Sequence, residues 1–457
     1  MKKKDRSGTQ DKRASPLRPQ DALRRTFEGL ADFVSRTLED GPKRATLLYI
    51  KTVADEDKIQ RYLVRAFFET DATRFRDYLK SHPFGISYVD EGQAAKMLLN
   101  GAVFVEFEGE PYLLDLRLLQ DTGIQRTEVE PVLQGPLNSL SETLLVNLNL
   151  LRFRYKQVNL AIELGEIGTR SQTNVALVYD RDLVKPHVLE ALRKAIQTPD
   201  LPALFAAGQL ERVFAGKFTL FPSYMVTDRP DRILQEITHG KVALLLDGSE
   251  FALIAPAYFF DFFASMDDVY HPGIARLFFL TMRFTAVLVT LLTPALYVAL
   301  TVYNPGAIRL PLTLSVAGSR AAVPFSAFFE VLFMMLAVEL LLEASMRLPK
   351  SISAAATTVG GIILGQATTT AGIVSDVMIL VIAVVAISSF VVPVNPMLYA
   401  VRIARYPLIG LASLFGLAGI LVGFAAYLYA LAERESFGEP YFYLPFSAGT
   451  SGKGVGR

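Results

Sequence analysis

The chain has 457 residues, of which 51% are hydrophobic and 20% are charged, and its formal net charge is +1. Residues 276–457 hold only 18 charged side chains, about 10%, whereas the first 275 residues hold the other 73, about 27%. A region of soluble type therefore precedes a region too apolar for water, which excludes a single soluble domain, a disordered chain and a disulfide scaffold.

Several kinds of chemistry are excluded by residue type. Without cysteine there is no disulfide, thiolate metal site or cysteine nucleophile. The four histidines lie far apart and form no HExxH pair, so we expect no metal site. The neutral charge balance gives no footprint for nucleic acid, and GTSGKG near the end does not match a phosphate-binding loop. We therefore predict a protein that is not an enzyme and has no cofactor.

The N-terminal region begins with a basic stretch of about 20 residues that predicts a disordered tail, because no apolar core follows it as in a signal peptide. Apolar residues within 21–39 have helical spacing, which predicts a helix that ends before Gly41 and Pro42. Residues 45–53 predict a buried strand, and a helix follows from about Asp55.

Two later segments align without a gap, GAVFVEFEGEPYLLD (101–115) and GKVALLLDGSEFALI (240–254). Each predicts a β-hairpin that follows a helix. A strand at 174–180 and a helix from Pro186 precede the second hairpin, in the order seen before the first. We interpret these as two related α/β subdomains, from an old duplication or by convergence on a common pattern. The matching glycines, at an offset of 139, are Gly101 with Gly240 and Gly109 with Gly248.

Two connecting segments have open interpretations. Residues 135–156 predict a connecting helix, and its Arg152, Arg154 and Lys156 would meet acidic lipid or a partner, or form a solvated helix end. The aromatic residues within 257–275 suit the membrane interface, or a core helix packed on the second subdomain.

Apolar runs fill the remaining sequence, and each is long enough to cross about 30 Å of hydrocarbon. The predicted spans are 277–303, 323–343, 352–372, 373–393 and 407–432. The third run is rich in glycine and threonine, as expected where helices pack closely or line water, and it either crosses or re-enters. Five crossings would leave the C-terminus on the far side of the membrane, with Arg402 and Arg405 in a cytoplasmic loop before the last span.

The predicted domains follow from these boundaries. They are a tail (1–20), subdomain 1 (21–130), a connecting helix (131–160), subdomain 2 (161–256), an interfacial aromatic segment (257–275), a transmembrane domain (276–435) and a C-terminal tail (436–457).

Ionisable residues at membrane depth cost about 2.5–3.5 kcal/mol each on insertion scales, so they need partners or a function. Glu339, Glu343 and Arg347 share one helix face, which predicts an ion path or gate, or pairing that fixes helix packing. Glu330 lies on the opposite side, and Arg283 is its candidate partner. Gly361 with Gly365 and Gly419 with Gly423 have GxxxG spacing, which allows close helix packing. The candidate pore or gating residues are Glu339, Glu343, Arg347, Gly360, Gly361, Gly365, Gln366, Thr368, Thr369 and Thr370.

Seven blocks of sequence together carry a family resemblance. They are TDRPDRILQEITHGKVALLLDGSEFALIAP (227–256), DDVY (267–270), LLTPALYVAL (291–300), AAVPFSAFFE (321–330), VELLLEASMRLPKSIS (338–353), VGGIILGQATTTAGIVSDVMI (359–379) and FGEPYFYLPF (437–446). From about Val132 to Phe446 the chain resembles the A subunits of the GerA family of bacterial spore germinant receptors. The combination of EAxxRLP with GGxxxGQA is the most specific part. The sequence departs from the family at 138–156, which is less basic, and at Val269, where the family usually has tyrosine.

The resemblance implies an α+β membrane protein of the spore inner membrane with a cytoplasmic N-terminal region. It implies a homo-oligomer, a pentamer, that works with a transporter-like GerB-type subunit, which binds the nutrient, and a GerC-type lipoprotein. The A subunit would be a channel in membrane lipid that releases monovalent cations. The alternatives are a SpoVAF-type amplifier of ion release, a non-conducting scaffold and signal relay, and a small-ligand site between the two α/β subdomains.

Overall fold

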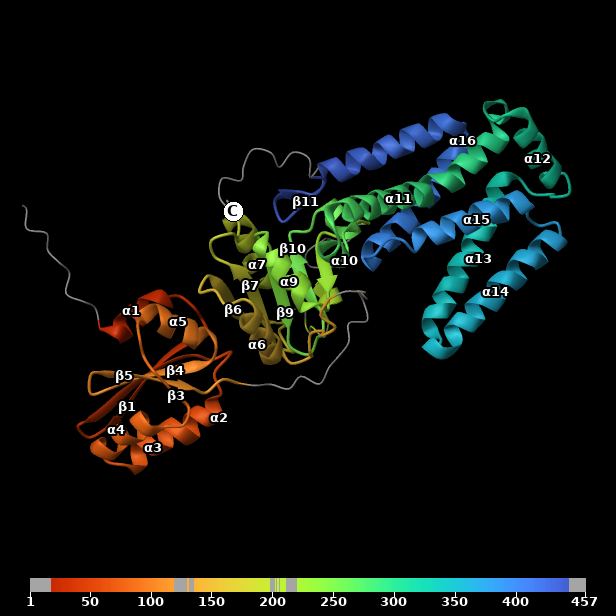
Figure 1. The fold of residues 1–457 in the computed structure, drawn as a ribbon. Helices are drawn as coiled ribbons and strands as arrows, with labels where there is room; N and C mark the ends of the chain where they lie inside the picture. Colours follow the sequence, from red (N-terminus) through yellow and green to blue (C-terminus); the bar gives the residue numbers. More distant parts are fainter. Residues whose placement is uncertain are drawn as a thin grey trace, which may run out of the picture.

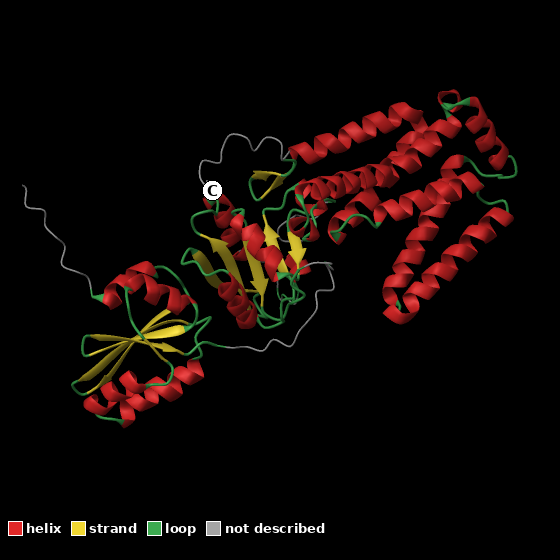
Figure 2. Ribbon diagram, viewed as in Figure 1, coloured by secondary structure: helices red, strands yellow, loops and turns green. Residues whose placement is uncertain are grey.

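The computed structural model describes residues 18–118, 130, 135–197, 202, 204, 206–210 and 220–443. Two α/β units, each built on a five-stranded sheet, are followed by a group of long helices (Figures 1 and 2). Residues 1–17 of the predicted tail and residues 444–457 of the predicted C-terminal tail lie outside the described residues.

The first unit is an antiparallel sheet with helices on both faces. Its strand order is β1-β2-β4-β5-β3, with β1 (Phe33–Asp40), β2 (Lys43–Ile50), β3 (Gly85–Ile86), β4 (Ala102–Phe107) and β5 (Glu110–Asp115). One apolar layer joins the sheet to α1 (Pro19–Thr26) and α5 (Glu91–Leu99). The other joins it to α2 (Glu56–Ile59), the π-helical turn η1 (Gln60–Val64), α3 (Arg65–Glu69) and α4 (Ala72–Ser81).

The helix predicted over 21–39 is wrong beyond Thr26. Residues 33–40 form the edge strand β1, and the turn at Gly41 and Pro42 returns the chain into β2. The strand is exposed along much of its length and buries only Leu38. Because so few apolar positions were available, their spacing matched a helix as well as a strand.

The second unit repeats this topology. Its strand order is β6-β7-β9-β10-β8, with β6 (Leu160–Ile167), β7 (Thr173–Asp180), β8 (Met225–Thr227), β9 (Val242–Leu246) and β10 (Ala252–Ala255). The helices α6 (Leu144–Arg154) and α9 (Pro230–Thr238) lie against one face. The helix α7 (Pro186–Gln197) and the 3₁₀ turn η2 (Ala207–Leu210) cover the other.

The correspondence extends from strands to helices, because α6 takes the place of α1, α7 that of α2–α4, and α9 that of α5. The predicted glycine match has a conformational reason. Gly101 (φ +93°) follows α5 and Gly240 (φ +82°) follows α9, and a Cβ at either would lie 2.5 Å from a backbone oxygen. The hairpins differ in one respect, since Phe107 pairs with Glu110, whereas Leu245 pairs with Ala252 across a longer turn.

The predicted connecting helix is shorter than 135–156, and α6 packs its leucines into the core of the second unit. Arg152 is fully buried, and its guanidinium binds the Asp32 carboxylate of the first unit at 2.8 Å and the Leu160 carbonyl at 2.7 Å. Neither lipid nor solvent is the partner of this arginine. It instead holds the two α/β units together.

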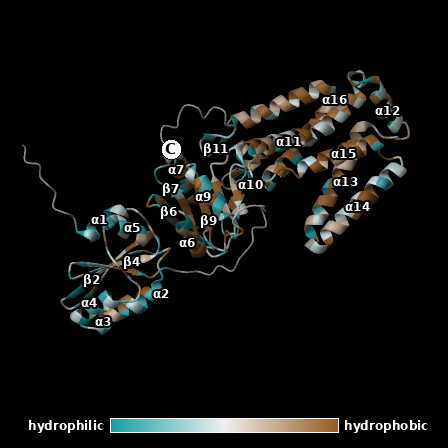
Figure 3. Ribbon diagram, viewed as in Figure 1, coloured by the Kyte–Doolittle hydropathy of each residue, from teal (hydrophilic) through white to brown (hydrophobic). Residues whose placement is uncertain are grey.

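The helical region follows the second unit and contains most of the strongly hydrophobic ribbon (Figure 3). Its elements are η3 (Phe259–Phe263), α10 (Asp267–Tyr270), α11 (Gly273–Val302), η4 (Pro305–Ala307), α12 (Leu310–Arg320), α13 (Ala327–Arg347), α14 (Lys350–Thr370), α15 (Asp376–Ser389), α16 (Asn395–Glu433), β11 (Glu435–Ser436) and β12 (Glu439–Pro440). Among the described residues, α11 is long and apolar enough to cross a membrane, as is α16 when its 39 residues are counted as one helix, and α15 is a shorter apolar helix.

The last predicted span, 407–432, is wrong as a single crossing. Gly416 has non-helical angles (φ +60°, ψ −139°) and divides α16 into two halves. The Tyr427 hydroxyl in the second half donates to the Ala404 carbonyl in the first at 2.5 Å, so the halves run antiparallel. The chain consequently returns toward the second unit, and the C-terminal segment up to Tyr443 is on the same side as that unit, contrary to the five-crossing prediction.

The aromatic segment before α11 lies in the core that joins the second sheet to the helices. Phe259, Phe262 and Phe263 are buried there, and Phe260 stacks near Phe284 of α11 with ring centroids 6.0 Å apart. This is the core-helix alternative rather than an exposed interfacial belt.

Candidate functional site

Helices α13 and α14 form a hairpin, and much of the surface of α14 is exposed in one chain. Helix α14 is continuous over 21 residues, or about 31 Å at 1.5 Å per residue. One side of it contacts α13, where the Ser353 hydroxyl donates to the Ser345 carbonyl at 2.9 Å and a Cβ at Gly360 would lie 3.0 Å from Leu341. On the remaining surface Val359 and Ile363 are more than half exposed. A surface that is both apolar and rich in small residues is therefore uncovered in one chain.

The predicted pore residues of α14 occupy several environments. Gly361 and Gly365 have open space around them, apart from an ordinary contact of Gly361 with Leu341. Gln366 and Thr370 are exposed. The Thr368 hydroxyl donates to Leu364 at 2.7 Å and the Thr369 hydroxyl to Gln366 at 3.0 Å, both within the helix. The Thr369 hydroxyl oxygen is partly exposed and still has acceptor capacity for a cation or for its water, whereas Thr368 is only 5% exposed.

The predicted charged stripe on α13 divides into two separate sites. Glu339 forms ion pairs with both Arg402 and Arg405 of α16. Glu343 instead pairs with Arg347 at 2.7 Å on the exposed side of its own helix. The net charge of Glu339 together with Arg402 and Arg405 is +1. A group with a positive net charge does not attract cations.

Arg402 and Arg405 were predicted in a loop, but both lie within the first half of α16. Only 4% of the Arg405 side chain and 13% of the Arg402 side chain is exposed. Their spacing of three residues puts both on one helix face, which was the signal available in the sequence. The helix that supplies them could not be recognised because Pro407 follows closely.

The predicted pair of Arg283 and Glu330 does not form. Arg283 pairs with Asp268 at the start of the helical region and donates to the Phe263 carbonyl at 3.1 Å. Glu330, which is 1% exposed, pairs with Arg320 at 3.3 Å and accepts from the Ser375 amide at 2.6 Å and hydroxyl at 2.5 Å. It thereby caps the N-terminus of α15 and ties α12, α13 and α15 together.

Gly419 and Gly423 lie where the two halves of α16 touch. A Cβ at Gly419 would overlap the Leu411 carbonyl oxygen, and one at Gly423 would lie 2.6 Å from the Leu408 side chain. The GxxxG spacing thus brings two helical segments of the same chain together.

The second unit meets the helices through buried charges. The Lys241 ammonium binds Asp261 at 2.6 Å and Glu236 at 2.7 Å, while Arg232 donates to the Ala264 carbonyl at 2.9 Å. Burial by itself would raise the pKa of Glu236, but Lys241 and Arg232 lower it overall. Burial would likewise lower the pKa of Lys241, but Asp261 and Glu236 raise it. Both groups are consequently held in their charged forms.

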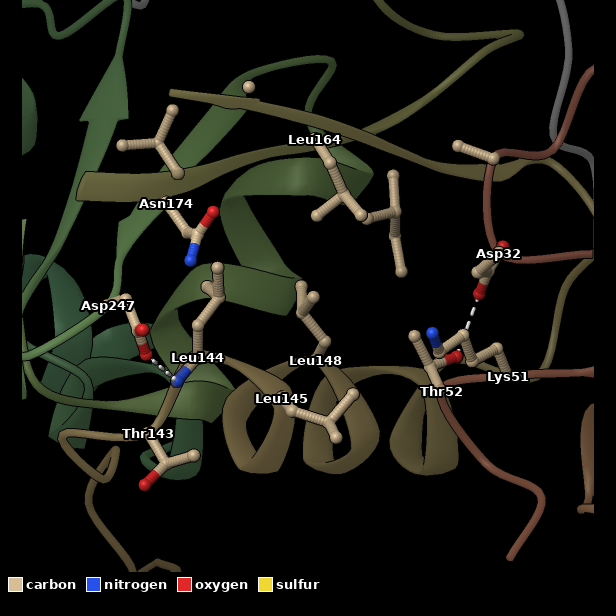
Figure 4. A pocket seen from close by; sticks show the side chains of 14 residues that line it. Asp32, Lys51, Thr52, Thr143, Leu144, Leu145, Leu148, Leu164, Asn174 and Asp247 are labelled. Atoms are coloured by element: carbon tan, nitrogen blue, oxygen red, sulfur yellow. Dashed lines mark hydrogen bonds between the residues drawn. The ribbon is translucent and has the colours of Figure 1, made fainter. Parts of the chain in front are cut away.

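A cavity of about 370 Å³ lies between the two α/β units (Figure 4). Asp32 and Thr52 line it from the first unit, and the Thr52 hydroxyl donates to Asp32 at 2.7 Å. Leu164, Asn174 and Asp247 line it from the second unit. The cavity is mostly apolar with a few polar groups at its edge.

Comparisons with known proteins agree with the resemblance carried by the sequence blocks. The family model described as Bacillus/Clostridium GerA spore germination protein matches residues 21–452. The chain belongs to this family.

Relatives include spore germination protein GerLA of Bacillus cereus, which is 31% identical over 87% of this chain and 83% of its own length. The membrane protein YfkQ of Bacillus subtilis (strain 168) is 29% identical over 96% of this chain and 88% of its own length. The N-terminal domain of the A subunit of the Bacillus megaterium germinant receptor GerK3 aligns with 52% of this chain and 94% of that domain, at 22% identity and a TM-score of 0.40.

Proposed function

We propose that this protein is the A subunit of a spore germinant receptor and forms an oligomeric channel in the spore inner membrane. It releases monovalent cations when a GerB-type partner senses a nutrient, and a GerC-type lipoprotein completes the complex. The two α/β units lie in the cytoplasm. Family membership supports the receptor, and the channel is the more specific part of the proposal.

One observation carries the channel proposal, namely the uncovered surface of α14. Its 21 residues make a helix about 31 Å long, which is close to the thickness of the hydrocarbon core, about 30 Å. In lipid, a surface of glycine, alanine and threonine gains little from contact with acyl chains, and it favours close contact with other helices or with water. Neighbouring copies of α14 arranged in a ring, a pentamer by family resemblance, would give it both.

The test uses the natural absence of cysteine. Single cysteines along 351–372 are introduced, and potassium release from spores is measured with and without a small charged thiol reagent. We expect block with helical periodicity, strongest at the open positions Gly361, Gly365 and Gln366. The matched control is Ser353, which faces α13. Complete labelling without block at any position would contradict the channel proposal.

The same experiment separates the two family-level alternatives. A non-conducting scaffold predicts that α14 variants change assembly but never the ratio of potassium to sodium released. A SpoVAF-type amplifier predicts block of release that other receptors trigger, in spores that lack a B subunit encoded with this chain. The present proposal requires that block occurs only when the partner B subunit is present.

The cavity between the α/β units supports a second candidate function, direct binding of a small polar ligand. Asn174 offers an exposed amide at the edge of a mostly apolar space, whereas the Asp32 carboxylate is already bound by Arg152 and Thr52. Equilibrium binding of germination nutrients to the purified full-length chain tests it, with Asn174→Leu as the variant that removes an edge group. Equal binding by both proteins, or none by either, would reject the cavity as the site.

A further inference from the structure

The C-terminal tether, which we define as residues Arg434–Tyr443, leaves the end of α16 and returns to the second α/β unit (Figure 1). Its strands β11 and β12 pair with each other, and hydrogen bonds from the tether hold it to that unit. The Ser436 hydroxyl donates to the Ser223 carbonyl at 2.6 Å and accepts from the Ala257 amide at 3.2 Å. Glu439 binds Lys185 at 2.6 Å and His187 at 2.8 Å beside the N-terminus of α7.

The inner part of the tether is buried as deeply as the core. Ser436 and Tyr441 are 0% exposed, and the Tyr441 ring lies 6.3 Å from the ring of Phe259. The Phe259 amide also donates to the Tyr441 carbonyl at 2.9 Å. Detaching the tether would expose this aromatic surface to water. The tether therefore stays bound to the second unit, because detaching it would cost the free energy of exposing apolar surface. A movement of the second unit is consequently transmitted to the end of α16.

The two halves of α16 transmit such a movement as one body. Gly419 and Gly423 allow the halves to touch at backbone distance, and the hydroxyl of Tyr427 bonds the carbonyl of Ala404. Close-packed contacts of this kind have little room to deform. A displacement of the second half thus carries the first half with it.

The first half of α16 carries Arg402 and Arg405, and both hold Glu339 of α13. Helix α13 in turn contacts α14 through Ser345 and Ser353. A continuous series of contacts thus runs from the second α/β unit through the tether, α16 and Glu339 to α14. The second unit also packs directly against α11, where Arg283 binds Asp268, and against the start of α16, where Met397 and Val401 belong to its buried core.

We propose that the C-terminal tether regulates the channel by coupling the second α/β unit to the α13–α14 hairpin. In this proposal Glu339 is the positioning residue, because its ion pairs attach α13 to α16. This rests on the proposed function, because α14 is the conducting element whose position is controlled. Glu339 contributes no cation site. It acts through its two arginines.

The experiment lengthens the tether without removing any contact. Ten Gly and Ser residues are inserted between Glu433 and Arg434 in the full-length receptor, so that both the tether and α16 keep their own partners. We expect the nutrient concentration for half-maximal potassium release to rise about 5–150-fold, the usual range of allosteric coupling. The control insertion, of the same length, is placed in the β1–β2 turn between Gly41 and Pro42. An unchanged nutrient response after insertion at Glu433 would overturn the proposal.

The joint at Glu339 is tested with a matched pair on one helix face. Glu339→Gln removes the carboxylate that holds α16, whereas Glu343→Gln, one turn away, removes an exposed charge that pairs with Arg347 of the same helix. We expect Glu339→Gln to raise the nutrient requirement with no change in ion selectivity, and Glu343→Gln to leave both unchanged. Combined with the insertion, Glu339→Gln should add little, because both act on one route. A selectivity change from Glu339→Gln would instead make it an ion site and overturn this assignment.

Failure of the tether and failure of the channel are distinguishable. Leu340, 71% exposed on α13, is replaced by cysteine, and its rate of thiol labelling is compared with and without nutrient. A nutrient-dependent rate that the Glu433 insertion abolishes supports the tether, even if cysteines on α14 never block release. An insertion without effect on this rate, in a protein whose α14 cysteines do block, rejects the tether and leaves the channel in place.

Discussion

The two α/β units have the same strand order and the same sequence of helices, yet they use one of their faces differently. In the first unit α1 and α5 complete the apolar layer on that face. In the second unit the equivalent helices, α6 and α9, share the layer with η3, α11, α16 and the C-terminal tether. The first unit thus covers this face with its own helices, whereas the second unit covers the equivalent face partly with elements of the helical region.

Charge follows the same division. The second unit places Arg232, Glu236 and Lys241 in buried contacts with the segment that leads to α11. Position 102 of the first unit, which corresponds to Lys241 at the offset of 139, is an alanine. Buried ion pairs add little net stability, but they penalise any other arrangement of the groups that they join. The difference teaches that the second unit is the one specified to couple to the helices.

The largest expected effect comes from removing a charge at the junction, by which we mean the buried contacts of Arg232, Glu236 and Lys241 with the segment that leads to α11. Lys241→Met leaves the buried Glu236 and the partly buried Asp261 without their shared cation, and it should lower the free energy of unfolding by about 3–5 kcal/mol. Lys58→Met in the first unit, where 37% of the side chain is exposed, should cost no more than about 1 kcal/mol. Thermal unfolding of the full chain in detergent measures both. Equal losses would show that the two units do not differ in this respect.

The next effect tests what the units share. Gly101→Ala and Gly240→Ala both force a side chain into a positive-φ position and against a backbone oxygen, so each should cost about 3 kcal/mol. Gly109→Ala and Gly248→Ala have positive φ but open space, and each should cost about 1 kcal/mol. Unequal costs at Gly101 and Gly240 would argue against equivalent positions in a repeat.

The pH dependence of the junction has two limbs. Because the folded-state pKa of Glu236 is lowered, its contribution is present above its ordinary value of 4.5 and is lost as the pH falls through the lower folded value. Because the pKa of Lys241 is raised, its contribution is present below 10.5 and is lost as the pH rises through the higher folded value. Melting temperature against pH should show Glu236→Gln removing the acid limb. Glu39→Gln on the exposed edge strand is the control.

The smallest effects belong to the outer helices, which resemble each other in the two units. Glu69→Gln breaks an exposed pair with Arg65 and should leave the free energy of unfolding almost unchanged, because solvent screens the pair. Glu163→Gln weakens bonds to Arg193 and to the Tyr179 hydroxyl on α7 and β7, and should cost about 1 kcal/mol. Denaturant unfolding resolves this difference. A loss at Glu163 as large as that at Lys241 would mean that both faces of the second unit are specialised.

The sequence by itself determined both hairpins, the strand at 174–180, the helix from Pro186 and the family. These features are local, because alternation of apolar residues, glycine turns and a proline at a helix start report on neighbours along the chain. The small-residue character of α14 was also evident from its composition, whereas its uncovered surface is seen only in the structure. The surface of α14 is uncovered in one chain, and the structure contains no second chain that could cover it.

Only the tertiary structure decided which charges pair and where the chain reverses. Arg283 pairs with Asp268 rather than with Glu330, and Glu339 pairs with two arginines of α16, because the partners of a charged group depend on which helices become neighbours. Gly416 reverses α16 inside a run whose composition is that of one uninterrupted span. The edge strand β1 was read as a helix because one exposed face leaves too few apolar positions to fix a period. Hydrophobic patterning reports burial, but it does not specify what each buried group meets.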